Sequence, residues 1–424
     1  MLRLRRLKIN KFRAVKPGTE LFFNDGFNLV LGRNATGKTT LLDLISMALR
    51  FDFSSIRDED FDVEVEVDEI LEGTSNSVVM QVGTRLDDSE MAARMPGQQQ
   101  RIPWVRATIR VGPHTYSYDE DGLNGRLLQN ETLVKSERLR GEWGRILLWQ
   151  ACFLIHEQEN SQMSLPIWES VEFVLRHDES LEAFKEDILS KLELNVTFVQ
   201  AGEKITLTDN GPLWHDDLFV PEGLLDEVNA RFAATPNAAV LTFSGDDLPF
   251  LDEFIQLCAF VSARLELSLL GKHAIRGSNN SWLATFGEPR FLFTRKDGKS
   301  TIRHELLSYG QKRLLSLLYF LKASPHHLVA DEMVNGLHHE WIEVLMEKIR
   351  GRQAFLSSQN PLLLDYMEFD SVDDVRSSFV LCELDELDHL VWRNMSAEEA
   401  SSFYSAYEVG IQHVGEILRT KGLW

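Results

Sequence analysis

The stretch GRNATGKTTLLDLI at residues 32–45 decides the fold of this chain. Its first eight residues fit the pattern GxxxxGK[ST] in full. Glycines at both ends of the loop allow a tight turn whose amides point at phosphate oxygens, and the following helix N-terminus adds partial positive charge. A lysine in this place reaches the β- and γ-phosphates of a nucleotide, and the next hydroxyl ligates Mg²⁺. The residues expected to bind nucleotide here are Gly32, Asn34, Gly37, Lys38, Thr39 and Thr40.

Regular secondary structure is predicted on both sides of this loop. The apolar segment GFNLVLG before it is typical of a strand, and TTLLDLISMAL after it is typical of a buried helix. The sequence VEVEV at residues 63–67 alternates with period two, as a half-exposed strand does. Further along, Asp297-Gly298 predicts a tight turn between strands. Ser396 and Glu399 predict a capping box at the start of the final helix.

A pair of acidic residues ends a second apolar strand. The segment HHLVADE, which starts at residue 326, places Asp331 and Glu332 directly after its apolar residues. One carboxylate of such a pair can face Mg²⁺ while the next faces an attacking water. Acidic pairs at strand ends are common and usually only solvated, so this pair gains its meaning from the phosphate loop upstream. The sequence predicts Thr39 and Asp331 as Mg²⁺ ligands and Glu332 as a catalytic residue.

A polar turn opens an otherwise apolar helix shortly before this pair. In LLSYGQKRLLSLLYFL, Ser308 stands where a helix N-cap is expected, and Gly310 and Gln311 follow in the first turn. A serine and a glycine at a helix N-terminus also form a site for an anion. The residues therefore fit both a capped core helix and an anion site.

Together these segments resemble the ABC-type ATPase heads of the SMC, RecF and OLD group. In that family an LSGGQ-like signature binds the γ-phosphate that the opposite subunit's phosphate loop holds. Ser308, Gly310 and Gln311 match the signature, whereas Tyr309 stands in place of its usual glycine. The resemblance implies that ATP is the nucleotide.

Three further segments match the family. Asn34 matches the asparagine of the family's GxNxxGK loop. Arg13 in INKFRAV lies where the family's NFR element carries a phosphate-proximal arginine. The segment NGLH at residues 335–338 looks like the ENGLHP form of the D-loop in OLD-like ATPases. The resemblance thus implies nucleotide contacts for Arg13, Asn335 and His338.

At one position this chain differs from the family's pattern in a residue that affects hydrolysis. The switch histidine, usually found in THSP after an apolar strand, is replaced by Gln359 in SSQNP. Glutamine can still donate a hydrogen bond to a γ-phosphate, but it cannot carry the charge of a histidine. ATP binding is therefore expected, with slow hydrolysis in which Gln359 acts beside Glu332. Gln150 and Gln158 are alternatives for the glutamine that the family links to Mg²⁺.

The resemblance implies an α/β fold, an ABC-type P-loop ATPase head with an inserted, mainly helical subdomain. Residues 1–130 would form the N-terminal ATPase lobe, and residues 286–424 the C-terminal lobe with the signature, Walker B, D-loop and switch segments. Residues 131–285 contain helical spacing of apolar residues, as in LPFLDEFIQLCAFVSARLELSLL, and the segment VTFVQAGEKITLTD predicts a hairpin. The sequence has no long heptad run, so no extended coiled-coil arm is expected.

The amino-acid composition limits which partners and which cellular location are expected. The formal net charge of -21 over 424 residues repels nucleic acid at long range, so DNA contact would need a local basic patch. Residues 1–16 carry seven Lys and Arg and no acidic residue, and form either such a patch or a strand with basic outward side chains. Three widely spaced cysteines predict a reduced, cytoplasmic protein. No apolar run approaches the ~20 residues that span a bilayer, so no membrane partner is expected.

The resemblance implies a homodimer, or a higher oligomer, in which two chains clamp two ATP molecules with Mg²⁺. Three uses of such a clamp are open. The first is a slow ATPase that acts as a sensor or switch over a separate effector, a nuclease or toxin, in bacterial antiphage defence. The second is a RecF-like repair ATPase whose closed dimer binds DNA, and the third is a nucleotide-gated scaffold with negligible turnover. Acidic clusters at residues 58–60 and 381–390 are attributed to solvated loops rather than to a nuclease site.

Overall fold

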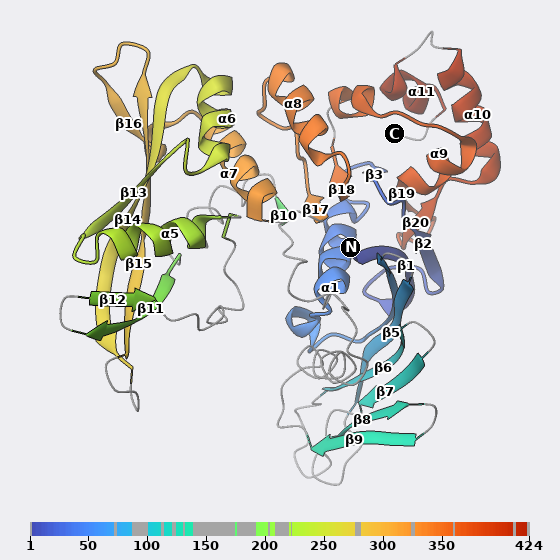
Figure 1. Ribbon diagram of the computed structural model, residues 1–424. Helices are drawn as coiled ribbons and strands as arrows, with labels where there is room; N and C mark the ends of the chain where they lie inside the picture. The colour runs from blue at the N-terminus through green and yellow to red at the C-terminus, as the bar shows by residue number, and fades with distance from the viewer. Residues whose placement is uncertain are drawn as a thin grey trace. The chain divides into compact units, whose positions relative to one another are not determined.

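The chain divides into two compact units in a computed structural model (Figure 1). Unit 1 comprises Met1–Val174, His326–Met333 and Ile349–Trp424, and unit 2 comprises Leu175–Pro325 and Val334–Lys348. Each unit has its own sheets and core and is described by itself. The structure describes residues 2–71, 74–86, 101–111, 114–120, 124–129, 132–138, 174–175, 192–201, 204–207, 220–221, 223–275, 281–323, 327–358, 361–409 and 413–421.

The central sheet of unit 1 is built from segments far apart in the sequence. Its order is β10-β17-β18-β3-β19-β20, in which β17, β18, β3 and β19 run parallel and β20 is antiparallel to β19. The strands are β3 (Phe27–Gly32), β10 (Val174–Leu175), β17 (His327–Ala330), β18 (Gln353–Ser357), β19 (Phe379–Leu384) and β20 (Leu390–Asn394). Strands β17 and β18 are buried along their whole length, as parallel strands covered on both faces are. The carboxyl ends of the parallel strands meet at one edge of this sheet.

An eight-stranded antiparallel sheet, in the order β2-β1-β4-β5-β6-β7-β8-β9, completes the β structure of unit 1. The strands are β1 (Leu2–Phe12), β2 (Thr19–Phe22), β4 (Phe61–Leu71), β5 (Thr74–Leu86), β6 (Arg101–Val111), β7 (His114–Glu120), β8 (Asn124–Gln129) and β9 (Thr132–Arg138). Along β4, Val63, Val65 and Val67 are fully buried, while Glu64 and Glu66 between them pair with a basic residue of β1. This alternation confirms the period-two prediction.

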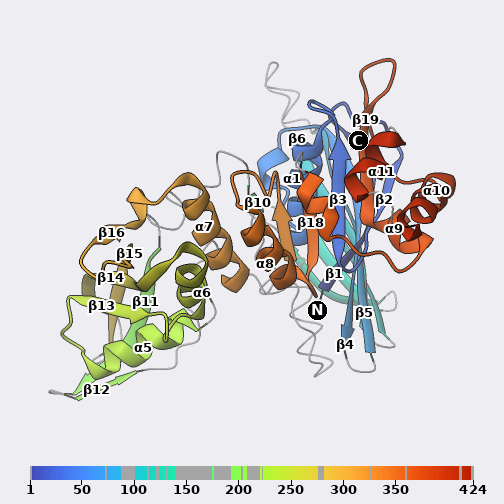
Figure 2. The ribbon, with the colours of Figure 1, turned by 90° about the horizontal axis from the view of Figure 1, so that it is seen from above.

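Helix α1 (Lys38–Arg50) packs into the core that the two sheets of unit 1 share. Leu41, Leu42, Leu44 and Ile45 are all fully buried, because a helix covered on both sides is apolar almost all round. Figure 2 shows α1 on one side of β3 and β18, and α9 to α11 on the other. The remaining helices of unit 1 are η1 (Ser54–Ile56), η5 (Pro361–Tyr366), α9 (Val372–Ser378), α10 (Ala397–Glu408) and α11 (Val414–Thr420). The predicted capping box is present at the start of α10.

Unit 2 is a six-stranded antiparallel sheet with helices packed against it. The strand order is β12-β11-β15-β14-β13, and β16 pairs with β15. The strands are β11 (Leu194–Ala201), β12 (Lys204–Leu207), β13 (Val240–Ser244), β14 (Phe260–Ala274), β15 (Ser281–Arg295) and β16 (Thr301–Arg303). The helices are α5 (Leu224–Ala234), α6 (Pro249–Cys258), η4 (His304–Leu306), α7 (Tyr309–Ala323) and α8 (His339–Ile349), of which α8 ends at the boundary with unit 1.

The core of unit 2 is aromatic. Phe232 of α5 packs against Phe198 of β11 at a ring distance of 5.0 Å. Phe250 of α6 packs edge-on against Tyr319 of α7 at 5.7 Å and against Phe291 of β15 at 6.3 Å. These contacts fix α7, whose first residues carry the signature, to the sheet of its own unit.

The predicted α/β class is confirmed, and one part of the fold prediction needs correction. Residues 131–285 were expected to be mainly helical, but in their described part only α5 and α6 are helices and strands predominate. The segment FVSARLELSLL lies in β14, because Ala263, Leu265 and Leu267 are buried at every second position. The hairpin pattern in VTFVQAGEKITLTD is confirmed by the pairing of β11 with β12. The boundaries 1–130, 131–285 and 286–424 stay a prediction.

Candidate nucleotide-binding site

The phosphate loop of unit 1 connects β3 to α1 through backbone that requires glycine at two positions. Gly32 has φ +155° and Gly37 has φ +83°. A Cβ at Gly32 would lie 2.3 Å from the carbonyl oxygen of Cys382, and a Cβ at Gly37 would lie 2.9 Å from a side chain of β20. The indole N–H of Trp392 donates to the carbonyl of Thr36 at 3.1 Å. Strands β19 and β20 thus support the loop closely, and neither glycine can be replaced without displacement.

Lys38 and Thr39 begin α1 next to this loop. The ammonium of Lys38 is buried and donates to the carbonyl oxygens of Gly32 at 2.9 Å and Arg33 at 3.1 Å. The hydroxyl of Thr39 donates to Oδ2 of Asp331, which follows β17, at 2.5 Å. The structure therefore brings together the hydroxyl and the carboxylate that the sequence predicted to share Mg²⁺. Both offer oxygen atoms, the ligands that Mg²⁺ prefers, and phosphate oxygens and waters can complete such a set.

Ser357, the last residue of β18, holds the two acidic residues in place. Its hydroxyl donates to Oδ1 of Asp331 and accepts a hydrogen bond from the backbone N–H of Glu332 at 3.0 Å. Glu332 has φ +51°, in the left-handed region that few residues other than glycine adopt, and it is buried. Strained backbone of this kind is concentrated at functional sites, where surrounding contacts maintain it. Ser357 supplies those contacts here.

Ser357, Cys382 and Trp392 were not identified from the sequence. Ser357 had an available signal, since it is a polar residue at the end of a buried strand and directly precedes the predicted switch segment. Cys382 and Trp392 had none, because nothing in β19 and β20 indicates that these strands run beside a loop so far upstream in the sequence. Their role depends on strand order, which local patterns do not encode.

Arg13, expected near a phosphate, is held by Glu59. Its Nε and Nη2 atoms donate to the two carboxylate oxygens of Glu59 at 2.8 and 2.7 Å, and its guanidinium lies over the ring of Phe12 at 4.9 Å. The side-chain hydrogen bonds of this pair raise the pKa of Arg13 and lower the pKa of Glu59. The bidentate geometry fixes the guanidinium. A phosphate contact of Arg13 stays a prediction, and it would require exchange for Glu59.

Other basic side chains of β1 are paired with carboxylates as well. The pairs are Arg5 with Asp25 and Asp68, Arg6 with Glu20, Glu64 and Glu66, and Lys11 with Asp60. The acidic partners lie mainly on β2 and β4, the neighbouring strands, or close to their ends. This part of the chain is therefore a strand with compensated basic side chains, as one of the two interpretations predicted.

In unit 2 the signature residues begin α7 with a reciprocal cap. The backbone N–H of Gln311 donates to Oγ of Ser308 at 3.3 Å, and Oε1 of Gln311 accepts from the backbone N–H of Ser308 at 3.0 Å. This is a capping box with glutamine as its second member. The N-cap interpretation of Ser308 is confirmed. A Cβ at Gly310 would lie 2.5 Å from the carbonyl oxygen of Gly336, so the signature turn and the D-loop are in contact within unit 2.

Tyr309, which departs from the family's glycine, packs against the same D-loop. A Cβ at Gly336, which has φ +75°, would lie 2.5 Å from a ring carbon of Tyr309. Asn335 beside it is half-buried, and His338 is exposed. The carbonyl of His338 accepts from the backbone N–H of Trp341 at 3.0 Å, in the first turn of α8. The D-loop residues thus form the turn that enters α8 and lie against the signature turn.

The remaining predicted residues have simple placements. Asn34 is exposed on the phosphate loop, and Thr40 is half-buried in the first turn of α1. Gln359, Gln150 and Gln158 lie outside the described residues. In the part of the chain that the structure describes, no group of three or more His, Cys, Asp or Glu side chains could hold a metal ion. Mg²⁺ at the phosphate loop would accordingly rely on Thr39, Asp331 and the nucleotide itself.

Two cysteines, one in each unit, are described as free thiols. Cys258 of unit 2 is half-buried and Cys382 of unit 1 is buried. Burial raises the pKa of each thiol to about 12. Both therefore behave as small apolar side chains at neutral pH, as predicted. Across the described residues, none of the helices has the length and apolar character needed to cross a membrane.

Two family models match the chain, and both describe an AAA domain. The first matches residues 6–193. The second, described as "AAA domain, putative AbiEii toxin, Type IV TA system", matches residues 187–365. A search of curated proteins found no match.

Solved structures with low similarity in sequence and geometry were also found. An SMC head bound to the C-winged helix domain of ScpA is 14% identical with a TM-score of 0.43, covering 94% of this chain and 99% of that one. The SMC head domain from Thermotoga maritima is 13% identical with a TM-score of 0.36, covering 93% and 99%. The recombination mediator protein RecF of the RecFOR pathway is 14% identical with a TM-score of 0.33, covering 93% and 98%.

Each AAA-domain model matches less than half of the chain, and the two overlap only at residues 187–193. The phosphate loop, the acidic pair after β17 and the capped signature turn of α7 are all present on one chain. Between them, the two matches show similarity to AAA domains over residues 6–365, a range that holds the phosphate loop, the signature turn and the acidic pair.

Proposed function

We propose that the chain binds ATP with Mg²⁺ at its phosphate loop, hydrolyses it slowly and closes as a homodimer around two ATP molecules. The hydrogen bond between Thr39 and Asp331 carries this proposal, because it joins the two predicted Mg²⁺ ligands from distant parts of the sequence. The signature turn on the same chain supports the dimer. A signature that acts on the ATP of a second copy makes each ATP site from two chains.

Different residues of unit 1 are assigned to the phosphates, to Mg²⁺ and to the attacking water. Lys38 exchanges its two carbonyl partners for oxygens of the β- and γ-phosphates. Thr39 and Asp331 hold Mg²⁺, which would neutralise charge on those phosphates. Glu332 accepts the proton of the attacking water and orients it. Gln359 is assigned beside Glu332 from the sequence alone; a glutamine there can donate a hydrogen bond to the γ-phosphate but cannot carry the charge of a histidine, which agrees with slow hydrolysis.

From unit 2 of the second copy, the signature turn meets the γ-phosphate. The hydroxyl of Ser308 and the N-terminal amides of α7 are suited to an anion, since a helix N-terminus carries partial positive charge. The capping box holds Ser308 and Gln311 in a fixed geometry before any ligand arrives. The turn therefore loses little conformational freedom when it meets the phosphate.

We further propose that this ATP-dependent closure is a cytoplasmic switch that controls a separate effector, a nuclease or toxin, in bacterial antiphage defence. The second family model is described as "putative AbiEii toxin, Type IV TA system", which agrees with a role in a toxin system but does not name a separate effector. Slow hydrolysis suits a switch that waits for a trigger. The pairing of Arg5, Arg6 and Lys11 with carboxylates disfavours β1 as a DNA-binding surface.

Steady-state ATP turnover with and without double-stranded DNA tests this proposal, with Lys38→Ala as the blank. Slow turnover above the blank that is indifferent to DNA is expected. Strong stimulation by DNA would replace the switch with a RecF-like repair function. Turnover no greater than that of the blank, in a chain that still binds ATP, would leave a nucleotide-gated scaffold.

A further inference from the structure

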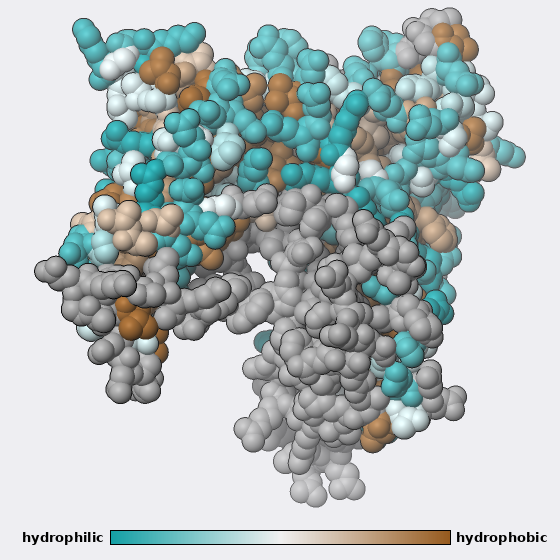
Figure 3. Space-filling model, viewed as in Figure 1, coloured by the Kyte–Doolittle hydropathy of each residue, from teal (hydrophilic) through white to brown (hydrophobic). Residues whose placement is uncertain are grey.

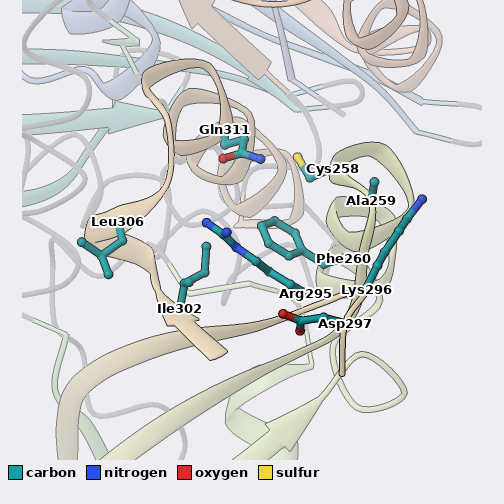
Figure 4. Close-up of a pocket in the computed structure, with 9 residues that line it drawn as sticks. All are labelled: Cys258, Ala259, Phe260, Arg295, Lys296, Asp297, Ile302, Leu306 and Gln311. Atoms are coloured by element: carbon teal, nitrogen blue, oxygen red, sulfur yellow. The ribbon is translucent and has the colours of Figure 1, made fainter. Parts of the chain in front are cut away.

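A pocket of about 440 Å³ opens in unit 2 beside the signature turn (Figure 4). Its walls are the corner between α6 and β14 at residues 258–260, the turn after β15 at residues 295–297, Ile302, Leu306 and Gln311. The volume falls in the range of small-molecule sites, roughly 300–1,000 Å³. Because Gln311 is a signature residue, a ligand that reaches the signature lies next to this pocket.

The turn after β15 gives this pocket cationic groups. The carboxylate of Asp297 is turned into its own loop, where it accepts from the backbone N–H of Lys299 at 2.9 Å, the backbone N–H of Ser300 at 3.0 Å and the hydroxyl of Ser300 at 2.7 Å. These bonds confirm the predicted turn at Asp297-Gly298. The bonds from Ser300 lower the pKa of the Asp297 carboxyl, and Arg295 lies close enough for its charge to lower that pKa as well. Both Arg295 and Lys296 line the pocket. Figure 4 shows Arg295 extending toward the side where Gln311 lies, while Lys296 extends the other way.

The pocket also has an apolar side. Phe260 and Ile302 contribute to its wall, and Leu306, which is 71% exposed, adds apolar surface at its edge. The end of unit 2 that holds β16 is otherwise mainly hydrophilic (Figure 3). Residues 290–313 hold seven Lys and Arg against two acidic residues, in a chain whose formal net charge is -21. Of these, Arg313 is buried and Arg290 pairs with Glu288. The exposed positive charge next to this apolar surface therefore comes mainly from Arg295, Lys296, Lys299 and Arg303.

We propose that Arg295 is a phosphate-binding residue supplied in trans, which contacts the polyphosphate of the ATP that a second copy's phosphate loop presents to the signature. This inference rests on the proposed ATP-bound dimer. A guanidinium matches phosphate geometry with two parallel hydrogen bonds, which the point charge of lysine cannot do. Leu306 and Phe260 offer the apolar surface that the nucleoside can cover. An arginine brought to a phosphoryl group in trans stabilises the charge of the transition state.

The first test compares Arg295→Ala with Lys299→Ala. Lys299 lies in the same turn, is exposed and does not line the pocket, and its substitution keeps the backbone N–H that Asp297 binds. Arg295→Ala is expected to lower the rate of ATP turnover by about ten-fold or more, while Lys299→Ala changes it by less than about two-fold. Arg295→Ala should leave ATP binding to a single chain unchanged, since the phosphate loop is in unit 1. Equal turnover in the two variants would overturn the inference.

Mixed chains test whether Arg295 acts in trans. Arg295→Ala and Lys38→Ala chains are each defective alone, but a mixed dimer has one site that combines an intact phosphate loop with an intact Arg295. Recovery of turnover on mixing supports the inference, and no recovery contradicts it. If the wild-type chain stays monomeric in ATP, the proposed function fails. If it dimerises and Arg295→Ala behaves like wild type, only the inference fails.

The polyphosphate that Arg295 contacts could come from nucleotide free in solution instead of from the ATP of a second copy. A fluorescent ATP analogue titrated into the Lys38→Ala chain distinguishes this source, because its phosphate loop is disabled. No binding is expected. Binding that Arg295→Ala removes would show that the pocket takes nucleotide from solution, and would overturn its assignment to the ATP of a second copy.

Discussion

The phosphate loop of unit 1 and the signature turn of unit 2 are organised in opposite ways. At the loop, Asp331 after β17 bonds to Thr39 of α1 and to Ser357 of β18, and Trp392 of β20 bonds to the loop itself, so these contacts all lie inside one unit. The signature turn is instead closed on itself by the cap between Ser308 and Gln311. Its polar side chains already bond to each other, and the turn does not bring together ligands for Mg²⁺. This difference agrees with the proposal that the loop binds ATP within one chain and that the signature turn meets ATP held by a second copy.

Lys38→Ala should have the largest effect, because it disables the region that binds ATP alone. Truncating a buried partner of a charge pair costs about 2–5 kcal/mol, so the Kd for ATP should rise by at least about 30-fold. Isothermal titration calorimetry measures this, with exposed Lys16→Ala as the control. If Lys38→Ala and Lys16→Ala bound ATP equally well, the phosphate loop would not be the nucleotide site.

Gly336→Ala should break the packing of the signature turn on the D-loop without touching the phosphate loop. The new Cβ would meet the Tyr309 ring and would also force φ +75° on alanine. The two effects together should lower the free energy of unfolding by about 2–4 kcal/mol. Gly351→Ala is the matched control, since Gly351 has φ +84° but open space around it, and should cost only about 1–2 kcal/mol.

A double variant distinguishes the backbone strain of Gly336→Ala from the steric clash of its Cβ with the Tyr309 ring. Tyr309→Ala removes the ring, so adding Gly336→Ala to it should cost no more than Gly351→Ala does. Urea-induced unfolding of the four variants provides the measurement. A full, undiminished penalty in the double variant would mean that Tyr309 does not pack on the D-loop.

The rates at which the two thiols are modified should give the smallest effect. These rates compare how exposed the thiol of each unit is. With Cys152→Ser as background, iodoacetamide should modify Cys258 faster than Cys382, and both slowly at neutral pH, because burial raises each pKa to about 12. Each raised pKa stabilises the fold below the ordinary thiol value of 9.0, and this contribution is lost as the pH rises from there toward about 12. Mass spectrometry of the labelled peptides checks the order. Faster labelling of Cys382 would contradict the close support of the phosphate loop by β19.

The parts of the site with local signals were predictable from the sequence. The loop at residues 32–39, the cap at Ser308 and the turn at Asp297-Gly298 each depend on backbone chemistry within a few residues, and the structure has these features as predicted. The helical prediction for residues 131–285 failed at β14, because a dense apolar run fits both periods until its partner strands are known. The contacts of Ser357 and Trp392 depend on which strands become neighbours. That order is set by the whole fold, so no local pattern contains it.

The central claim is that ATP joins two chains through their loops and signatures. Glu332→Gln keeps the size of the side chain but removes the carboxylate that accepts the proton of the attacking water, so ATP should persist in its site. Sedimentation velocity of this variant at saturating ATP and Mg²⁺ is the most direct measurement. The account predicts a dimer with ATP and a monomer without it, and a Lys38→Ala, Glu332→Gln double variant that stays monomeric. A Glu332→Gln chain that remains monomeric at saturating ATP would contradict the account.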